Sequence, residues 1–385
     1  MAAAGFLGAF VIFEPAPYEL FVCVLMVLFF LGGLTVTRHS MPLLLLTSLY
    51  SLGGMITLFQ LTSPSSQVVY VAVTFFLGLT SWFFALVVQQ DVFRLKVIIN
   101  GYVIGAVLTA ALGSIAYLGL LPGGDMFLRF GRARGAFQDP NVFAPFLVLP
   151  AAWLWHGILT KPSNLILLRA AGLSILLVGI LLAFSRAGWG LVLFALGGVY
   201  LVAFMQARTL VKRVQLLALA GVGAVAMLGA LLVALQFEQI SSVFETRARV
   251  VQDYDGGALG RFERHALGFQ LAFEKPFGIG RSEFAKLFTE DPHNIWLKSL
   301  MVYGWLGFVA YLVLTLWTLK CGFKTLFYSR PWTPYLQVLY VVFLGHIVMA
   351  YVIDIDHWRH MFLITCLLWG IYGLEASHQK QMQRN

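Results

Sequence analysis

The chain has 385 residues, of which 60% are hydrophobic and only 11% charged, and its mean hydropathy is +0.84. This composition excludes an ordinary soluble protein, and apolar runs long enough to cross about 30 Å of hydrocarbon recur along the whole length. The three cysteines lie in or beside apolar segments, where neither a disulfide framework nor a metal site is expected. We therefore predict an all-α polytopic membrane protein.

Twelve segments have the apolar character of membrane spans. The first is short, and Pro15 and Pro17 separate it from the second, so eleven spans are the alternative. It has no basic leader and no cleavage site, which favours a short first helix over a signal peptide. The predicted spans lie near 2–13, 18–36, 41–61, 68–89, 97–120, 141–159, 165–184, 186–205, 214–235, 294–319, 333–353 and 359–375.

These spans are expected to form one transmembrane domain over residues 1–385. The largest connection is 236–293, between the ninth and tenth spans. It is the only connection with room for structure outside the bilayer, and short amphipathic helices are expected in it.

The distribution of charge predicts the orientation of the chain. With twelve spans and both ends inside, the inner segments hold 13 basic residues and two acidic ones, whereas the outer segments hold 13 basic and 15 acidic residues. Seven of the outer basic residues fall in the large loop, and long loops contribute little to the positive-inside rule. The net charge of +9 is therefore a topology signal, not a nucleic-acid-binding surface.

Five arginines in short outer connections depart from that rule. They are Arg129, Arg132, Arg134, Arg186 and Arg359. A single interfacial arginine often does no more than reach lipid headgroups. Five of them beside helix starts favour a site for an anion, and a phosphate is the anion expected at a membrane surface.

Helix-start patterns accompany these arginines on the outer side. In all four of them a residue that can cap a helix comes first, and in two a proline follows it at the first helical position. The motifs are Asp139-Pro140-Asn141, Ser185-Arg186, Asp291-Pro292-His293-Asn294 and, as a possible start of the twelfth span, Asp356-His357. Capping alone explains each motif. If the helix ends converge, their positive dipoles and the arginine forks would cradle a pyrophosphate.

The large loop contains an amphipathic pattern after Gly260-Arg261. Apolar residues follow at helical spacing, at Phe262, Ala266, Phe269 and Phe273. This spacing predicts a helix that lies on the membrane or on the bundle, with Arg261 and His265 on a shared face. The stretch Pro276-Phe277-Gly278-Ile279-Gly280 is then expected to end the helix and turn the chain back.

His293 is the candidate reactive group. At the second position of a helix, the positive dipole end disfavours an imidazolium, and a neutral ring can accept the proton of an attacking hydroxyl. A histidine that only hydrogen-bonds a loop is an equal alternative. Weaker candidates are His265, His357 and His360, and the competing carboxylates are Asp139, Glu263, Asp291 and Asp354.

In this order, the motifs resemble the O-antigen ligase / polysaccharide polymerase superfamily of membrane glycosyltransferases. The resemblance spans roughly residues 120–310, and it rests on the order and membrane side of the motifs more than on any one of them. It is carried by Arg132–Asn141, Ser185-Arg186-Ala187-Gly188, Gly260-Arg261, Pro276-Phe277-Gly278-Ile279-Gly280 and Pro292-His293-Asn294. It implies a GT-C-like fold.

The resemblance also implies an enzyme of the bacterial inner membrane with its active site in the periplasm. Such an enzyme moves a glycan from an undecaprenyl-pyrophosphate donor to an acceptor hydroxyl, without a cofactor or metal ion. Arg186 and Arg261 would hold the pyrophosphate with help from Arg132 and Arg134, and His293 would activate the acceptor. The expected supporting residues are Asp139, Asn141, Asp291, Asn294, His265, Arg264 and Arg359.

The acceptor leaves two versions of this activity open. A ligase transfers to lipid A–core, which is the first choice, and a polymerase transfers to another lipid-linked glycan. The large loop, where an acceptor would be recognised, is compact. A lipid-glycan flippase or a secondary transporter is the alternative from another class. Transporters show internal repeats and charges near the bilayer midplane, whereas here the charges cluster at the outer ends of the spans.

Overall fold

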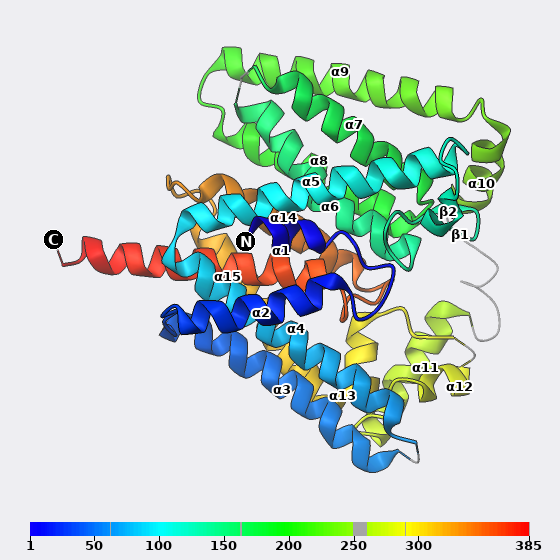
Figure 1. Cartoon of the computed structure of the whole chain (residues 1–385), viewed down its shortest axis with the longest axis vertical. Helices are drawn as coiled ribbons and strands as arrows, with labels where there is room; N and C mark the ends of the chain where they lie inside the picture. The colour runs from blue at the N-terminus through cyan, green and yellow to red at the C-terminus, as the bar shows by residue number, and fades with distance from the viewer. Residues whose placement is uncertain (62, 162–163, 249–259, 289, 385) are drawn as a thin grey trace. The chain divides into compact units, whose positions relative to one another are not determined.

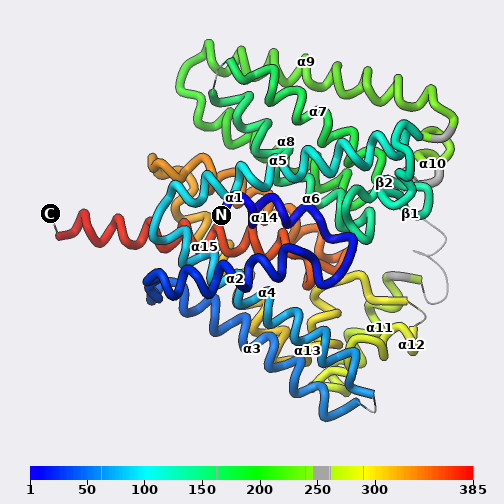
Figure 2. Tube along the Cα trace, in the orientation of Figure 1, coloured from blue at the N-terminus to red at the C-terminus, as the bar shows by residue number. Residues whose placement is uncertain are grey.

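The computed structural model describes residues 1–61, 63–161, 164–248, 260–288 and 290–384, without the side chains of 239, 246–248 and 261. The described residues are helical almost throughout (Figure 1), and Figure 2 traces the same path. The helices are α1 (Ala2–Leu7), α2 (Pro17–Leu31), α3 (Met41–Thr57), α4 (Ser65–Gln90), α5 (Val92–Tyr117), α6 (Pro140–Thr160), α7 (Ile166–Leu182), α8 (Arg186–Gln206), α9 (Leu210–Ala234), α10 (Glu238–Ala248), α11 (Arg261–Glu274), α12 (Glu283–Phe288), α13 (Ile295–Thr325), α14 (Thr333–Met349) and α15 (Arg359–Met382).

Short elements complete the secondary structure. They are the 3₁₀ turns η1 (Arg38–Ser40), η2 (Leu58–Gln60) and η3 (Gly124–Phe127), and the strands β1 (Leu128–Arg129) and β2 (Arg132–Ala133). The two strands pair antiparallel, with Arg129 opposite Arg132. They form a small hairpin just before α6.

Eleven of the twelve predicted spans each correspond to one helix. Among the described residues, eight helices are long and apolar enough to cross a membrane, and α2, α7 and α14 are shorter apolar helices. The first predicted span, 2–13, is wrong in length, because α1 has only six residues. Six residues make about 9 Å of helix, too little to cross the hydrocarbon core. The protein is therefore a polytopic all-α membrane protein, as expected.

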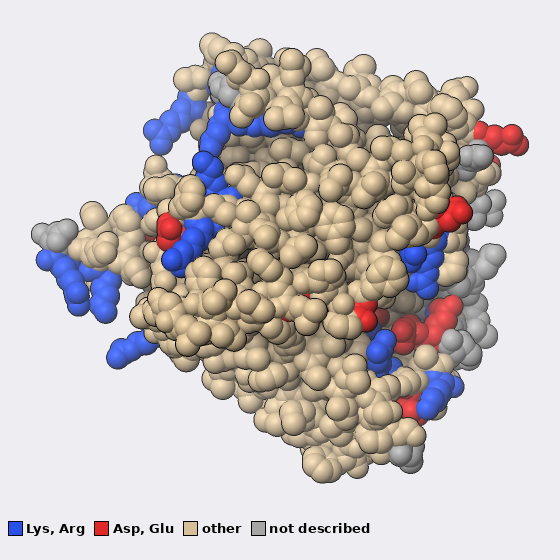
Figure 3. Space-filling model, viewed as in Figure 1, with Lys and Arg blue, Asp and Glu red and all other residues tan. Residues whose placement is uncertain are grey.

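Charged side chains avoid the flanks of the helices. On the face drawn in Figure 3, Lys and Arg (blue) and Asp and Glu (red) lie near helix ends and connections, and the flanks between them are uncharged. Helix α9 is the extreme case, since Leu216 is its one buried residue among those described. An apolar helix with exposed sides is expected where lipid is the solvent.

The chain divides into two compact units. Unit 1 consists of Met1–Tyr18 and Ile98–Val250, and unit 2 of Glu19–Val97 and Val251–Asn385. Helix α5 begins in unit 2 and continues into unit 1. The family-like motifs are divided between the units, so each unit is described by itself.

In unit 1, α6, α7 and α8 pack closely through small residues. A Cβ on Gly188 of α8 would lie 2.6 Å from the Cβ of Ala144 in α6, and a Cβ on Gly179 of α7 would lie 3.1 Å from the Leu147 side chain. Such contacts let backbones approach where apolar lipid gives helices little reason to associate. Because Gly188 and Ala144 are both near the starts of their helices, the N-termini of α6 and α8 lie side by side.

In unit 2, α3 packs along α13 and α4 along α15. Helix α13 is broken at Gly304, whose φ of 61° lies in the left-handed region. The break exposes backbone groups that the turn after α11 satisfies. The Trp305 N–H donates to the Pro276 carbonyl at 2.9 Å, and the Met301 carbonyl accepts from Ile279 at 2.7 Å and from Gly280. The predicted turn at Pro276–Gly280 is confirmed, and it docks in the kink of α13.

The predicted amphipathic helix is confirmed as α11. Phe262 and Phe273 of its predicted apolar face are 64% and 75% exposed, as a face that lies on the membrane would be. The helix packs on α13 through Phe269 of that face and Ala272, and through Gly268, where a Cβ would lie 2.8 Å from the Leu297 side chain. The missing side chain of Gly268 allows this close approach.

Candidate functional site

Arg132 joins the starts of α6 and α8 in unit 1. Its side chain is buried, its Nε donates to the Ala183 carbonyl at 2.7 Å and its Nη2 donates to Asn141 Oδ1 at 2.8 Å. Asn141 lies in the first turn of α6, and Ala183 lies just before α8. The strand β2 thus holds a guanidinium between two helix N-termini, as the sequence predicted for an anion site.

The neighbouring arginines bind the same connection. Arg134 donates to the Met126 carbonyl at 3.0 and 3.2 Å and to the Gln138 carbonyl at 3.2 Å. Arg129 donates to the same Gln138 carbonyl at 2.7 Å. These acceptors are uncharged oxygens, and Arg129 Nη1 also lies 3.8 Å from the Asp139 carboxylate. The contacts of the two arginines therefore order the loop.

The two predicted helix starts of unit 1 are confirmed. Asp139 caps α6 by accepting from the Asn141 N–H at 2.7 Å, and Pro140 is the first helical residue. Ser185 caps α8 by accepting from the Gly188 N–H at 3.3 Å, and Arg186 is the first residue of α8. Arg186 is half-buried, beside the end that Arg132 fastens. The free N–H groups and positive dipole of both helices therefore accompany the arginines.

In unit 2, α11 fastens the segment that leads to α13. Arg264 is buried and pairs with Glu290, Nη2 to Oε2 at 2.7 Å. His265 is buried as well, and its Nε2 donates to the Pro292 carbonyl at 2.6 Å. These two predicted supporting residues position the chain on either side of Asp291. The side chain of Arg261, at the start of α11, lies outside the described residues.

The predicted helix start at Asp291 is wrong. The cap of α13 is Asn294, whose Oδ1 accepts from the N–H groups of Trp296 at 3.0 Å and Leu297 at 3.1 Å. His293 therefore precedes the helix, with a φ of 46°, and 46% of its side chain is exposed. Asn294 has the shorter reach to the second and third N–H groups of α13, which explains why it and not Asp291 caps.

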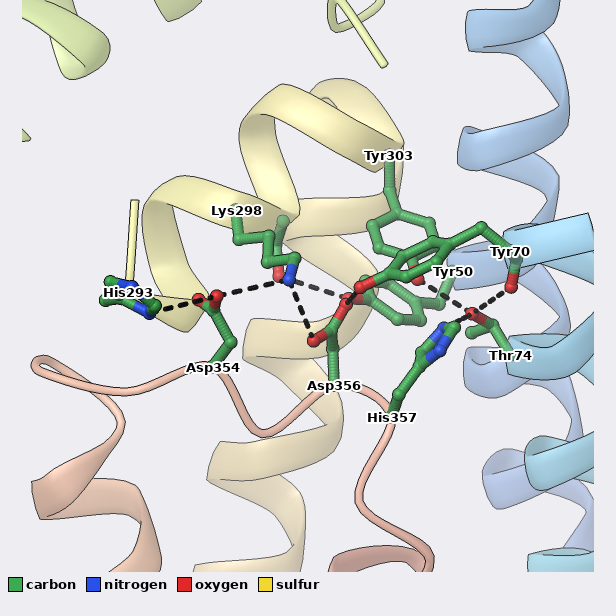
Figure 4. A network of polar contacts seen from close by, with 10 residues as sticks. Tyr50, Tyr70, Thr74, His293, Lys298, Tyr303, Asp354, Asp356 and His357 are labelled. Atoms are coloured by element: carbon green, nitrogen blue, oxygen red, sulfur yellow. Dashed lines mark hydrogen bonds and ion pairs between the residues drawn. The ribbon is translucent and has the colours of Figure 1, made fainter. Parts of the chain in front are cut away.

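His293 faces a carboxylate that begins a buried polar network (Figure 4). Its Nδ1 lies 3.8 Å from Asp354 Oδ2. The same oxygen is 3.1 Å from Lys298 Nζ, and that ammonium is 3.7 Å from Asp356 Oδ1. Lys298 thus lies between the two carboxylates, and His293 stands at the exposed end of the chain of charges.

Aromatic residues enclose the other end of the network. The Tyr70 hydroxyl donates to Asp356 Oδ2 at 2.6 Å, and the His357 ring stacks on Tyr70 with centroids 3.7 Å apart. His357 Nε2 and the Tyr303 hydroxyl each lie 2.7 Å from the Thr74 hydroxyl. Tyr50 stacks on Tyr303 at 3.9 Å. These residues come from α3, α4, α13 and the connection before α15, so the network joins four parts of unit 2.

The two carboxylates of the network have opposite pKa shifts. Burial raises the pKa of Asp354, and Asp356 raises it further, against the opposing effect of Lys298. Burial alone would also raise the pKa of Asp356, but Lys298, His357 and the Tyr70 hydroxyl outweigh it and hold that pKa below its usual value. The ionised form is therefore more stable for Asp356 than for Asp354, and Asp354 is the carboxylate that is protonated more easily.

Two further predicted sites have other roles. Asp356-His357 does not open α15, which begins at Arg359 after Trp358. Arg359 pairs with Glu19 of α2, which gives this outer arginine a partner inside unit 2. His360 is buried against His346 and Trp358.

Sequence reasoning missed Lys298, Asp356, Tyr70 and Thr74. The signal for Lys298 was present, because a lone lysine in the second turn of an apolar span is costly unless it is paired. Its partners lie 56 and 58 positions later, in the connection before α15, so no local motif joined them. Among the described residues, no group of three or more His, Cys, Asp or Glu could hold a metal ion.

Two comparisons place these sites in a wider context. The fold and its two charged sites define a polytopic helical membrane protein with cationic helix starts in one unit and a histidine–carboxylate network in the other. Residues 171–312 match the family model described as O-antigen ligase, so the resemblance predicted for roughly 120–310 is confirmed over that stretch. Arg186, Arg261 and His293 lie within the match, and Arg132 and Arg134 precede it. No curated protein matches the chain significantly.

Proposed function

We propose that this protein is a periplasmic glycosyltransferase that moves a glycan from an undecaprenyl-pyrophosphate donor to an acceptor hydroxyl. The observation that carries the proposal is the O-antigen ligase match over 171–312, together with the pairing of His293 and Asp354 at 3.8 Å inside unit 2. The match supports a membrane glycosyltransferase-like activity. The donor, the acceptor and the roles below are our proposal.

In this proposal the arginines stabilise the leaving group. Pyrophosphate is already a good leaving group, so the site must balance growing negative charge and need not protonate an oxygen. Arg186 and Arg261 hold the two phosphates, and Arg132 and Arg134 support them with the N-termini of α6 and α8. A preorganised donor of this kind commonly contributes about 3–4 kcal/mol to a barrier in a water-poor site.

His293 is the proposed general base. It takes the proton of the acceptor hydroxyl while that oxygen attacks the anomeric carbon, and the bond from that carbon to the pyrophosphate oxygen breaks with its electrons. The attack inverts the anomeric configuration and uses no metal ion. Its 46% exposure lets an acceptor approach, and Asp354 stands behind the ring as a counter-charge.

The first choice of acceptor is lipid A–core, which makes the enzyme an O-antigen ligase. Transfer with purified lipid-linked glycan and alternative acceptors, with and without a chelator, tests the proposal. Formation of the ligated product in the presence of chelator supports it, and no transfer to any glycan acceptor would refute it.

A polymerase that joins lipid-linked repeat units is the second candidate, because the large loop, where an acceptor would be recognised, is compact, with Arg261 and His293 only 32 positions apart. The two separate in cells that lack the gene. Loss of a ligase leaves long polymer on its lipid carrier, whereas loss of a polymerase leaves single repeats on the acceptor.

A further inference from the structure

Lys298 is a buried cation that two carboxylates share. Its side chain is 10% exposed, and its Nζ lies 3.1 Å from Asp354 Oδ2 and 3.7 Å from Asp356 Oδ1. One ammonium and two carboxylates leave one negative charge in excess. In a buried site such an excess must be matched by a cation or removed by a proton.

The two carboxylates are not equivalent in their contacts. Asp356 uses Oδ2 to accept from the Tyr70 hydroxyl at 2.6 Å and faces Lys298 with Oδ1. Asp354 has a buried Oδ1 with no hydrogen-bond partner among the described residues, and its Oδ2 faces both Lys298 and His293. The excess charge is thus placed on the carboxylate beside the exposed imidazole.

We propose that Lys298 is a positioning residue that keeps Asp354 and Asp356 ionised together, so that Asp354 stabilises the imidazolium that His293 becomes. The inference rests on the proposed function of His293 as base. In the step concerned, the acceptor hydroxyl gives its proton to His293, its oxygen bonds to the anomeric carbon, and the pyrophosphate leaves with the electron pair. Lys298, Asp354 and Asp356, which we call the triad, carry one excess negative charge. The positive charge that forms on the His293 ring balances it.

Removal of Lys298 should change the protonation of one carboxylate more than that of the other. Two neighbouring carboxylates in a buried site cannot both stay ionised without their cation. Tyr70 and His357 still favour the ionised form of Asp356, so Asp354 takes the proton and no longer faces His293 as an anion. The other titratable groups around the triad are Asp291, Tyr50, Tyr303 and Tyr311, and none of them is a cation. The guanidinium of Arg281 lies over the Tyr70 ring, 4.5 Å from its centroid, so it contacts the ring and forms no ion pair with either carboxylate among the described residues.

A purely mechanical role would give a different pattern. If the triad only fastened α13 to the connection before α15, D354N and D356N would act alike. Under the proposal they differ. D356N leaves Lys298 paired with an ionised Asp354, and its amide oxygen can still accept from Tyr70, whereas D354N removes the charge behind His293.

The charge-balanced double variant K298M/D356N is the sharpest test. K298M leaves two buried carboxylates without their cation, and adding D356N returns the site to a single negative charge on Asp354. Transfer by K298M should fall by about tenfold or more, the factor that one pKa unit represents. Transfer by K298M/D356N should recover most of that loss, and K298R should stay near wild type.

A second measurement does not depend on glycan transfer. Diethyl pyrocarbonate modifies neutral imidazoles, and mass spectrometry reports modification of the exposed His293 across a pH series. The pH of half-modification should be lower in K298M than in the wild type and should return in K298M/D356N. Absence of transfer by the wild type would defeat the proposed function, whereas an unchanged half-modification pH in folded K298M would overturn the inference.

Folding is checked by the thermal unfolding temperature of each purified variant. If K298M does not fold, D354N and D356N decide alone. Equal transfer and equal half-modification pH in those two variants would overturn the proposal. Loss of both properties in D354N with retention in D356N supports it.

Discussion

The arginine connection of unit 1 and the Lys298 network of unit 2 hold their cations in opposite ways. Arg132 donates to a carbonyl and to an amide oxygen, and both of these acceptors are uncharged. Lys298 lies between two carboxylates, which overcompensate its charge. The first arrangement suits an anion, and the second suits a group that becomes positive. The proposed transfer releases pyrophosphate and moves a proton from the acceptor hydroxyl to His293, so it would use both.

The largest expected effect on glycan transfer comes from removing the proposed general base, His293. H293A should lower transfer by about 10²–10⁴-fold, the usual contribution of a positioned general base. Because His293 is half exposed and precedes the helix, the thermal unfolding temperature of H293A should stay near that of the wild type. A folded H293A enzyme with wild-type transfer would remove His293 from the mechanism.

Neutralising the two carboxylates of the network should have different effects on the stability of the fold. Burial raises the pKa of Asp354, so its ionised form costs stability at pH 7 and D354N should not lower the unfolding temperature. The pKa of Asp356 is lowered against the effect of burial, chiefly by Lys298, so its ionisation adds stability above its unfolded pKa of about 4. That stability is lost as the pH falls through the lower folded pKa.

D356N should therefore unfold at a lower temperature than wild type at pH 7, and the difference should shrink as the pH falls below the unfolded pKa of about 4. Thermal unfolding in detergent across this range measures it. Equal losses for D354N and D356N at pH 7 would contradict the opposite shifts.

In unit 1, the variants R132M and R129M compare a buried arginine with an exposed one. R132M removes a buried hydrogen bond to the Ala183 carbonyl and a partly buried one to Asn141, and it should cost about 2–3 kcal/mol of unfolding free energy. R129M is the matched control, because Arg129 is 42% exposed in its contact with Asp139 and exposed ion pairs contribute about 0–1 kcal/mol. Similar losses in both variants would show that Arg132 does not fasten α6 to α8.

The smallest effect concerns the helix caps. D139A and N294A should each cost about 1 kcal/mol, the usual loss when a capping side chain is removed. D291A, at the position wrongly predicted as the cap, should cost less than N294A in the same unfolding measurement. The reverse order would favour the cap predicted from the sequence.

The parts that the sequence predicted correctly are local. At Asp139-Pro140 and at Ser185-Arg186, the capping residue and the first helical residue are adjacent in the sequence. The turn at Pro276–Gly280 is indicated by its glycines. One failure is local, because Asp291 and Asn294 are three positions apart and both can cap a helix, and the pattern did not choose between them. The other features involve distant partners. Gly268 of α11 packs on Leu297, and Lys298 pairs with carboxylates in the connection before α15, so spacing along the chain did not predict them.

The most direct test separates donor binding from transfer in purified protein with a lipid-linked glycan. We predict that H293A binds the donor as the wild type does but does not transfer the glycan, and that R186A and R261A bind it at least about tenfold more weakly. Wild-type donor affinity in both arginine variants, or wild-type transfer by H293A, would contradict the account.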